Sequence, residues 1–147
     1  MIMNTLEDKK KEIVEQFAMF DDWMDKYEYL IDLGKQLSAY PEEEKTEENL
    51  IKGCQSRVWL KCHIEEGKIF FIADSDAIIT KGIISLLVDV YSGRKPEEII
   101  SEDFSFINEI GLKENLSPTR ANGLVSMIDR IKNLALENVK KRHYGII

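Results

Sequence analysis

Two segments in the middle of the chain, residues 57–64 and 68–73, constrain its fold more than any other feature. The first alternates strictly, with Val58, Leu60, Cys62 and Ile64 on one face and Arg57, Trp59, Lys61 and His63 on the other. This period of two is typical of a half-buried β-strand. Glu65-Glu66-Gly67 then turns the chain, so the two segments predict an antiparallel β-hairpin. Leu50-Ile51 adds either a short third strand or an extended lead-in.

Helical periodicity surrounds the hairpin on both sides. Thr5 is suited to cap a helix that starts at Leu6, and Asp21-Asp22 to cap a second helix. Residues 78–90 are apolar on most sides, which predicts a central buried helix packed across the hairpin. Ser117-Pro118 opens a long last helix. The expected fold class is therefore α+β, in which a small antiparallel sheet, the hairpin plus a possible third strand, packs against several helices.

Two glycines and one proline refine this expectation. Gly34 and Gly123 fall within helical patterns, where glycine weakens a helix. Gly34 indicates either a close approach to another element or an early end of its helix, and Gly123 suggests close packing. Pro96 begins a short helix. Residues 104–112 predict an irregular stretch that packs aromatic and aliphatic bulk.

Composition and charge limit the classes of function. The 147 residues predict a single domain over 1–147, with about 1–5 and 140–147 as flexible ends. The net charge of −7 disfavours a nucleic-acid partner. The first residues lack the pattern of a signal peptide, and no apolar run is long enough to span a membrane. Two cysteines are too few for a disulfide framework, so we expect a cytoplasmic protein with reduced thiols.

Cys54 lies at the junction between a charged loop and the first strand. Gly53 precedes it and lets the backbone bend, and the polar run Gln55-Ser56-Arg57 follows it. An exposed or half-exposed thiol near an arginine is a setting in which thiolate character rises. The alternative interpretation is a merely tolerated surface cysteine. Cys62 shares the apolar face of its strand, so we expect it to be a core residue.

Two further polar positions lie at expected helix starts. Ser75 and Asp76 are most simply helix caps. Arg120 falls in the first turn of the last helix, where the helix dipole disfavours a cation. A carboxylate or a thiolate is therefore expected beside it, unless it is a surface arginine that points into water.

Metal and hydrolase chemistry have weak support in the sequence. Cys54, Cys62, His63 and His143 are the candidate soft ligands, but Cys62 and His63 point to opposite faces of a strand. The chain has no Cys-x-x-Cys or His-x-x-x-His spacing, so a zinc site is not expected. A Cys–His hydrolase would need a histidine such as His63 near Cys54, and no motif orients one.

Three runs of sequence occur in a characteristic order. They are Gly53-Cys54-Gln55-Ser56-Arg57-Val58-Trp59-Leu60, Asp74-Ser75-Asp76-Ala77-Ile78-Ile79-Thr80-Lys81-Gly82 and Leu116-Ser117-Pro118-Thr119-Arg120-Ala121-Asn122-Gly123-Leu124. Together they resemble the SufE family of cysteine-desulfurase partner proteins, the group that includes CsdE. The resemblance extends from about Phe17 to Leu136.

This resemblance implies a sulfur-acceptor protein with an α+β fold shared with IscU-type scaffolds. Cys54 would take persulfide sulfur from a SufS-type desulfurase that uses pyridoxal phosphate, stimulate that enzyme, and relay the sulfur to a SufBCD-type iron–sulfur scaffold. The chain would carry a covalent persulfide without being an enzyme itself, and it would need no cofactor. Asp76 and Arg120 are expected near the Cys54 loop, whose supporting residues would be Gly53 and Gln55-Ser56-Arg57. A monomer and a homodimer both remain open.

One departure and one alternative accompany the resemblance. The family pattern predicts glutamine at position 57, where this chain has Arg57, a positive charge three residues from the thiol. This charge would change either the pKa of the thiol or its docking partner, and transfer needs no general base if Arg57 or Arg120 already favours the thiolate. The alternative function is a scaffold that itself binds iron or an iron–sulfur cluster. A cluster needs about four thiolate-type ligands, so two cysteines would require bridging between subunits.

Overall fold

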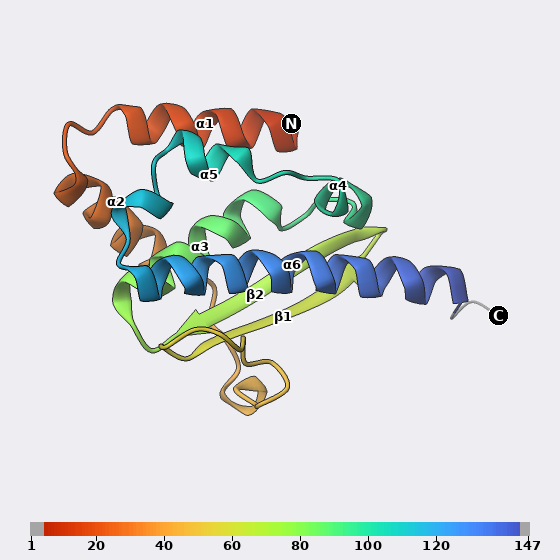
Figure 1. Ribbon diagram of the computed structural model, residues 1–147. Helices are drawn as coiled ribbons and strands as arrows, with labels where there is room; N and C mark the ends of the chain where they lie inside the picture. The colour runs from red at the N-terminus through yellow and green to blue at the C-terminus, as the bar shows by residue number, and fades with distance from the viewer. Residues whose placement is uncertain (1–4, 145–147) are drawn as a thin grey trace.

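The computed structural model describes residues 5–144, with side chains through residue 141, and it shows an α+β fold (Figure 1). The elements follow in the order α1 (Leu6–Ala18), α2 (Trp23–Lys35), β1 (Val58–Glu65), β2 (Lys68–Ser75), α3 (Ile78–Tyr91), α4 (Pro96–Ile100), α5 (Ser105–Glu109) and α6 (Pro118–Tyr144), with 3₁₀ turns η1 (Glu42–Glu44) and η2 (Lys113–Asn115). α3 contacts both α1 and the hairpin, and it lies between them, while α6 runs along the hairpin (Figure 1). The predicted fold class is confirmed.

The hairpin has the predicted antiparallel arrangement. Its register pairs Val58 with Ser75 at the open end and Glu65 with Lys68 at the turn. The turn residues Glu66 and Gly67 have positive φ angles of 52° and 79°, which match the right-handed twist of the strands. Within the described residues the sheet has two strands, because Leu50 forms only an isolated bridge to Trp59. Residues 50–51 are therefore an extended lead-in.

The burial of β1 departs from the strict alternation. Trp59, assigned to the solvent face, is only 9% exposed, whereas Ile64, assigned to the core face, is 44% exposed. The segment before β1 accounts for Trp59: Leu50 bridges to it, and the Lys45 ammonium lies 5.2 Å from its ring centroid. Ile64 lies next to the turn, so the core does not cover it.

The central position of α3 depends on a close approach to α2. Leu86, Leu87 and Val90 of α3 are fully buried, as the apolar pattern predicts. Gly82 faces Gly34 of α2, and a Cβ atom added to Gly82 would lie 2.3 Å from the carbonyl oxygen of Leu30. The close approach suggested at Gly34 is confirmed, and it exists because both helices have a glycine at the crossing.

The first two helices begin where the local signals predict, whereas a later segment differs from expectation. Thr5 and Asp8 form a capping box at α1, and the Asp22 side chain caps α2. Residues 104–112, expected to be irregular, contain α5, which Phe104 introduces from a left-handed backbone conformation.

The ends of the chain differ in part from expectation. α6 continues through Tyr144, so residues 140–144, expected to be flexible, are helical. Residues 1–4 and 145–147 lie outside the described residues. No helix within 5–144 has the length and apolar character that a membrane crossing requires.

Candidate functional site

The Cys54 loop, residues 52–57, is fixed to the hairpin at both of its ends. On its N-terminal side the Ile51 N–H donates to the Val58 carbonyl at 2.8 Å. On its C-terminal side the Arg57 N–H donates to Asp76 Oδ1 at 3.1 Å, and the Ser75 hydroxyl donates to the Arg57 carbonyl at 2.8 Å. The loop is therefore held across a short span, and Cys54 lies between the two attachments.

Gly53 allows the loop to approach the last helix. Its φ angle is +94°, which lies in the left-handed region that favours glycine. A Cβ atom at this position would lie 2.3 Å from Ser126 Oγ of α6. Both the backbone conformation and the contact with α6 therefore require glycine immediately before the cysteine.

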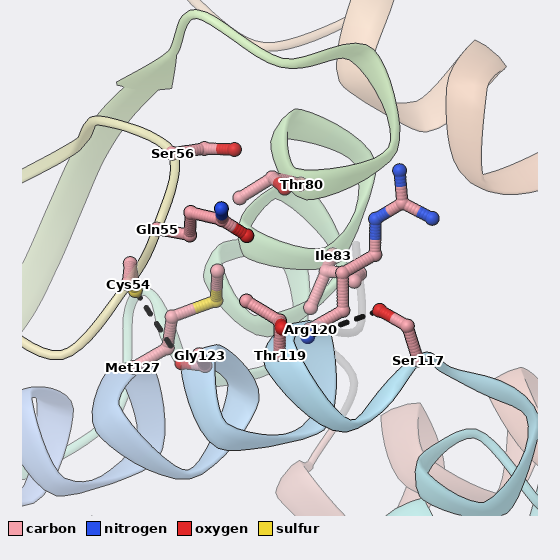
Figure 2. Close-up of a pocket in the computed structure, with 10 residues that line it drawn as sticks. All are labelled: Cys54, Gln55, Ser56, Thr80, Ile83, Ser117, Thr119, Arg120, Gly123 and Met127. Atoms are coloured by element: carbon pink, nitrogen blue, oxygen red, sulfur yellow. Dashed lines mark hydrogen bonds between the residues drawn. The ribbon is translucent and has the colours of Figure 1, made fainter.

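Cys54 lies at a pocket of about 250 Å³ that all three family-like runs help to form (Figure 2). The lining residues are Cys54, Gln55 and Ser56 from the loop, Thr80 and Ile83 from α3, and Ser117, Thr119, Arg120, Gly123 and Met127 from α6 and its cap. Of these, Thr80, Ile83, Gly123 and Met127 are buried, so the buried part of the lining combines apolar side chains with the Thr80 hydroxyl. The resemblance placed Arg120 near the loop, and the structure agrees.

The Cys54 thiol is half-buried and neutral in its environment. Its Sγ donates to the Gly123 carbonyl at 3.6 Å (Figure 2). Burial raises the pKa of this thiol above its ordinary value of 9.0. The expectation that Arg57 or Arg120 favours the thiolate is therefore wrong for this conformation, because neither guanidinium offsets the burial.

Arg120 contributes to the pocket mouth in an unexpected orientation. Its guanidinium points away from Cys54, toward the start of α3 (Figure 2). Within the described part of the chain it forms no ion pair, so the expected carboxylate or thiolate partner is not present there. Arg120 is exposed, so water offsets the unfavourable interaction of its charge with the helix dipole. Ser117 caps the first turn of α6, because its Oγ accepts from the Arg120 N–H at 3.3 Å.

Ser75 and Asp76 hold the loop instead of capping a helix. The N-cap residue of α3 is Ala77, which has no side-chain cap hydrogen bond. Ser75 ends β2 and accepts from the Ala77 N–H at 3.3 Å, while Asp76 accepts from Arg57 as described above. The capping interpretation is wrong because the carbonyl and N–H of Arg57, directly before β1, bind these side chains.

Cys62 lies away from the pocket and is less buried than expected. Its Sγ is half-buried and accepts from Asn138 Nδ2 at 3.5 Å, and burial raises its pKa. His63 points to the other face of the strand and stacks on Phe70. Among the described residues no three of the types His, Cys, Asp and Glu gather as metal ligands. The side chain of His143 lies outside the described part.

Met127 and Thr80 line the pocket although sequence reasoning did not single them out. Met127 follows Gly123 by four residues, so helical periodicity places the two on one face of α6. That spacing could have identified Met127. Thr80 gave no comparable signal, because its position depends on how α3 packs.

Comparison with known proteins identifies the family. The SufE profile, described as an Fe–S metabolism associated domain, matches residues 11–135. An uncharacterised SufE-like protein of Rhizobium etli is 43% identical over 129 residues, which cover 84% of this chain and 87% of the relative. The chain belongs to the SufE family. A second uncharacterised SufE-like protein, from Rhizobium meliloti strain 1021, is also 43% identical over 129 residues, with 84% of this chain and 92% of the relative covered.

A solved structure shares the fold of this chain. The solution structure of a hypothetical protein from Thermus thermophilus superposes with a TM-score of 0.75 at 21% identity. It covers 90% of this chain and 96% of its own. At this identity the likeness establishes the fold alone. The SufE match contains the whole Cys54 loop and every residue that lines its pocket.

Proposed function

We propose that this SufE-family protein accepts persulfide sulfur on Cys54 from a SufS-type cysteine desulfurase. It stimulates that desulfurase by removing the sulfur, and it passes the sulfur to a SufBCD-type iron–sulfur assembly scaffold. The pyridoxal phosphate belongs to the desulfurase. The observation that supports this proposal most is the position of the Cys54 sulfur, at a pocket built from all three family-like runs.

The transfer step is a thiolate attack on a divalent sulfur. The Cys54 thiol first loses its proton to solvent. The Cys54 thiolate then attacks the outer sulfur of the persulfide on the desulfurase cysteine. A new S–S bond forms on Cys54, the S–S bond of the donor breaks, and the donor cysteine leaves as a thiolate. No external oxidant or reductant is needed, because the sulfane sulfur moves between cysteines at a constant oxidation level.

The pocket protects Cys54 between transfers. The thiol is neutral where it rests, since burial raises its pKa, and a neutral thiol reacts slowly with oxidants. The thiolate is the nucleophile, so transfer requires the loop to move the Cys54 sulfur into more polar surroundings. The attachments of the loop at residues 51 and 57 leave Lys52 through Ser56 as the part that can move.

Intact-mass spectrometry tests the proposal directly. The protein is incubated with a SufS-type desulfurase, pyridoxal phosphate and L-cysteine, and its peptides are then mapped. We expect the added mass of one or more sulfur atoms on the Cys54 peptide, reversed by a reductant. The matched variants are Cys54→Ser, which should accept no sulfur, and Cys62→Ser, which should accept it at the rate of the unmodified protein.

The outcome also separates the alternative sites. Sulfur on Cys62, with Cys54 dispensable, would contradict the assignment of the acceptor. A failure of both cysteines to gain sulfur would contradict the acceptor function as a whole, and iron binding by the purified chain would then be measured as the test of the scaffold alternative.

A further inference from the structure

The hydrogen bond of the resting Cys54 thiol suits a thiol but not a persulfide. The thiol donates to the Gly123 carbonyl, with 3.6 Å between Sγ and the oxygen (Figure 2). An outer sulfur bonded to Sγ at about 2.05 Å in this direction would collide with that oxygen. The oxygen would also repel it, because a persulfide ionises more readily than a thiol and a carbonyl can only accept hydrogen bonds. The outer sulfur of a loaded Cys54 therefore has to point elsewhere.

The pocket beside the thiol has the space for an outer sulfur, but its lining offers little positive charge. Its volume of about 250 Å³ is many times that of one sulfur atom. A charged sulfur in a half-buried place needs a cation or a hydrogen-bond donor beside it. Arg120 of α6 is the one cationic side chain of the lining, and its guanidinium points away from Cys54 (Figure 2). α3 contributes no ionisable group to the lining, and the nearby Lys81 lies 3.2 Å from Asp74. The donor must therefore come from an uncharged side chain.

Gln55 is the lining residue that is best placed to supply this donor. It follows Cys54 directly in the loop, and its side chain extends over the pocket toward Thr80 of α3 (Figure 2). A side-chain amide has two N–H donors. Those of Gln55 form no hydrogen bond with any residue that the structure describes. The amide is therefore free to bind a group that enters the pocket.

The position of Gln55 in the chain also separates it from the other polar groups of the lining. Thr80 belongs to α3, where it is 6% exposed, and the Gly123 carbonyl belongs to α6. Both stay with their helices when the loop moves. Gln55 lies in the same mobile part of the loop as Cys54, so its amide can stay with the sulfur when the loop leaves the pocket.

We propose that the Gln55 side-chain amide donates to the outer sulfur of loaded Cys54, whereas the unloaded thiol donates to the Gly123 carbonyl. This inference rests on the function proposed above, because it concerns Cys54 in its sulfur-loaded form. The two hydrogen bonds are opposite in kind, one to an acceptor and one from a donor, so the site distinguishes the loaded state from the empty state. Gln55 thereby keeps the outer sulfur ionised and turned away from α6.

The test loads Cys54 chemically, with glutathione persulfide in place of a desulfurase, in a Cys62→Ser background where Cys54 is the single thiol. The Cys54 thiolate attacks the outer sulfur of the donor, the S–S bond of the donor breaks, and glutathione leaves as its thiolate. Intact mass verifies the gain of one sulfur atom. The near-ultraviolet absorbance of the ionised persulfide, followed over pH, gives its pKa, and dithiothreitol is used to measure how fast the outer sulfur is lost.

The variants of Gln55 differ in their capacity to donate. We expect Gln55→Met, which keeps the length but has no N–H, to raise the pKa of the loaded persulfide by about one pH unit, because a hydrogen bond to the charged form is lost. The larger neutral fraction at neutral pH is a better target for a thiolate, so loss of the outer sulfur should be about threefold faster or more. Gln55→Glu, which only accepts and adds a negative charge, should raise this pKa further. Gln55→Lys, which donates, should return it to the wild-type value or below.

Two controls separate a sulfur-binding role from a structural one. Unloaded Cys54 of the Gln55→Met variant should be alkylated by iodoacetamide at the wild-type rate, because the unloaded thiol donates to Gly123 and not to Gln55. Gln36→Met replaces an exposed glutamine that follows α2 and lies outside the lining of this pocket. It should change neither the loaded nor the unloaded protein.

The possible results distinguish this inference from the function on which it rests. A wild-type pKa and rate of sulfur loss in Gln55→Met would overturn the role of Gln55, and so would equal changes in the loaded and unloaded protein. A folded wild-type chain that glutathione persulfide fails to load, under conditions that load it in urea, would also overturn it, because the pocket would then have no place for the outer sulfur. Chemical loading needs no desulfurase. Failure of a desulfurase to transfer sulfur, with the expected behaviour of the chemically loaded variants, would therefore overturn only the proposed function and leave the role of Gln55 supported.

Discussion

The Cys54 side chain combines burial with the reactivity that the proposed function requires. Cys54 is half-buried at its pocket, and the one hydrogen bond of its side chain in the structure goes to a backbone carbonyl. Neither of the nearby arginines lowers its pKa, which burial raises. The structure therefore describes a protected resting state. A reactive state requires the sulfur to leave this pocket or to meet a partner that changes its surroundings.

The rate of Cys54 alkylation measures this protection. In Cys62→Ser, where Cys54 is the single thiol, we expect alkylation at neutral pH to be at least several-fold slower in the folded protein than in urea. Burial raises the pKa of Cys54 in the folded state, so its neutral thiol contributes full stabilisation of the fold at pH values below the unfolded-state pKa near 9.0. This stabilisation is lost as the pH rises through the pKa of Cys54 in the folded state. Equal alkylation rates in both states would show that the thiol is not protected.

The Cys54 loop packs closely on α6 because each has a glycine at the contact, Gly53 in the loop and Gly123 in the helix. Gly53 contacts Ser126 closely and Gly123 lies beside the cysteine, so the loop follows the surface of the helix. The hydrogen bonds of Arg57 to Asp76 and Ser75 hold the other end of the loop to the hairpin. The position of the sulfur thus depends on three elements that are distant in sequence.

Substitution of Gly53 tests this contact against a matched glycine. Gly67 also has a positive φ angle, 79°, but no atom lies within 4 Å of the position of an added Cβ. Gly67→Ala should therefore cost only the backbone strain of about 1–2 kcal/mol in the free energy of unfolding. Gly53→Ala should cost about 1 kcal/mol more, because Ser126 must change its rotamer, and it should speed Cys54 alkylation. Urea unfolding gives the two free energies.

The Ser126→Ala background supplies the control for this comparison. Without the Ser126 hydroxyl, the two glycine substitutions should cost similar free energies. A Gly53→Ala penalty that persists unchanged in this background would assign the effect to the backbone conformation alone.

Across the whole molecule, a buried ionic group connects the N-terminal helix to the central helix. Lys10 Nζ lies 2.9 Å from Glu102 Oε1, and the Tyr91 hydroxyl donates to Glu102 Oε2 at 2.6 Å. The Glu102 side chain is only 5% exposed. This group joins α1, the end of α3 and the segment after α4, on the side of the molecule away from the Cys54 loop (Figure 1).

Glu102→Gln should lower the free energy of unfolding by about 3 kcal/mol, because it leaves the Lys10 ammonium with less compensation in a buried place. Glu7→Gln is the matched control. Glu7 lies at the same 2.9 Å from Lys10 Nζ, but its side chain is 83% exposed, and removal of such a surface pair costs less than about 1 kcal/mol. Thermal or urea unfolding of both variants compares the two, and similar losses would contradict the buried role of Glu102.

The local sequence determined the elements and the order of the motifs. The Thr5 capping box, the Glu66-Gly67 turn and the Ser117-Pro118 helix start each depend on residues within a few positions of one another, so their patterns are readable without the fold. The same holds for the family, because the three runs around Cys54 and Arg120 follow one another in the chain.

Only the tertiary structure decided the state of the site. Cys54 contacts Gly123, which lies 69 positions away, and burial between elements distant in sequence raises the thiol pKa. The charges of Arg57 and Arg120 suggested the opposite shift, because sequence proximity does not reveal where a guanidinium points. The sequence suggested a helix cap at Asp76, because sequence proximity does not reveal the partner of its side chain either. Its partner, the N–H of Arg57, is brought to it by strand pairing across the hairpin, and such long-range pairing is set by packing.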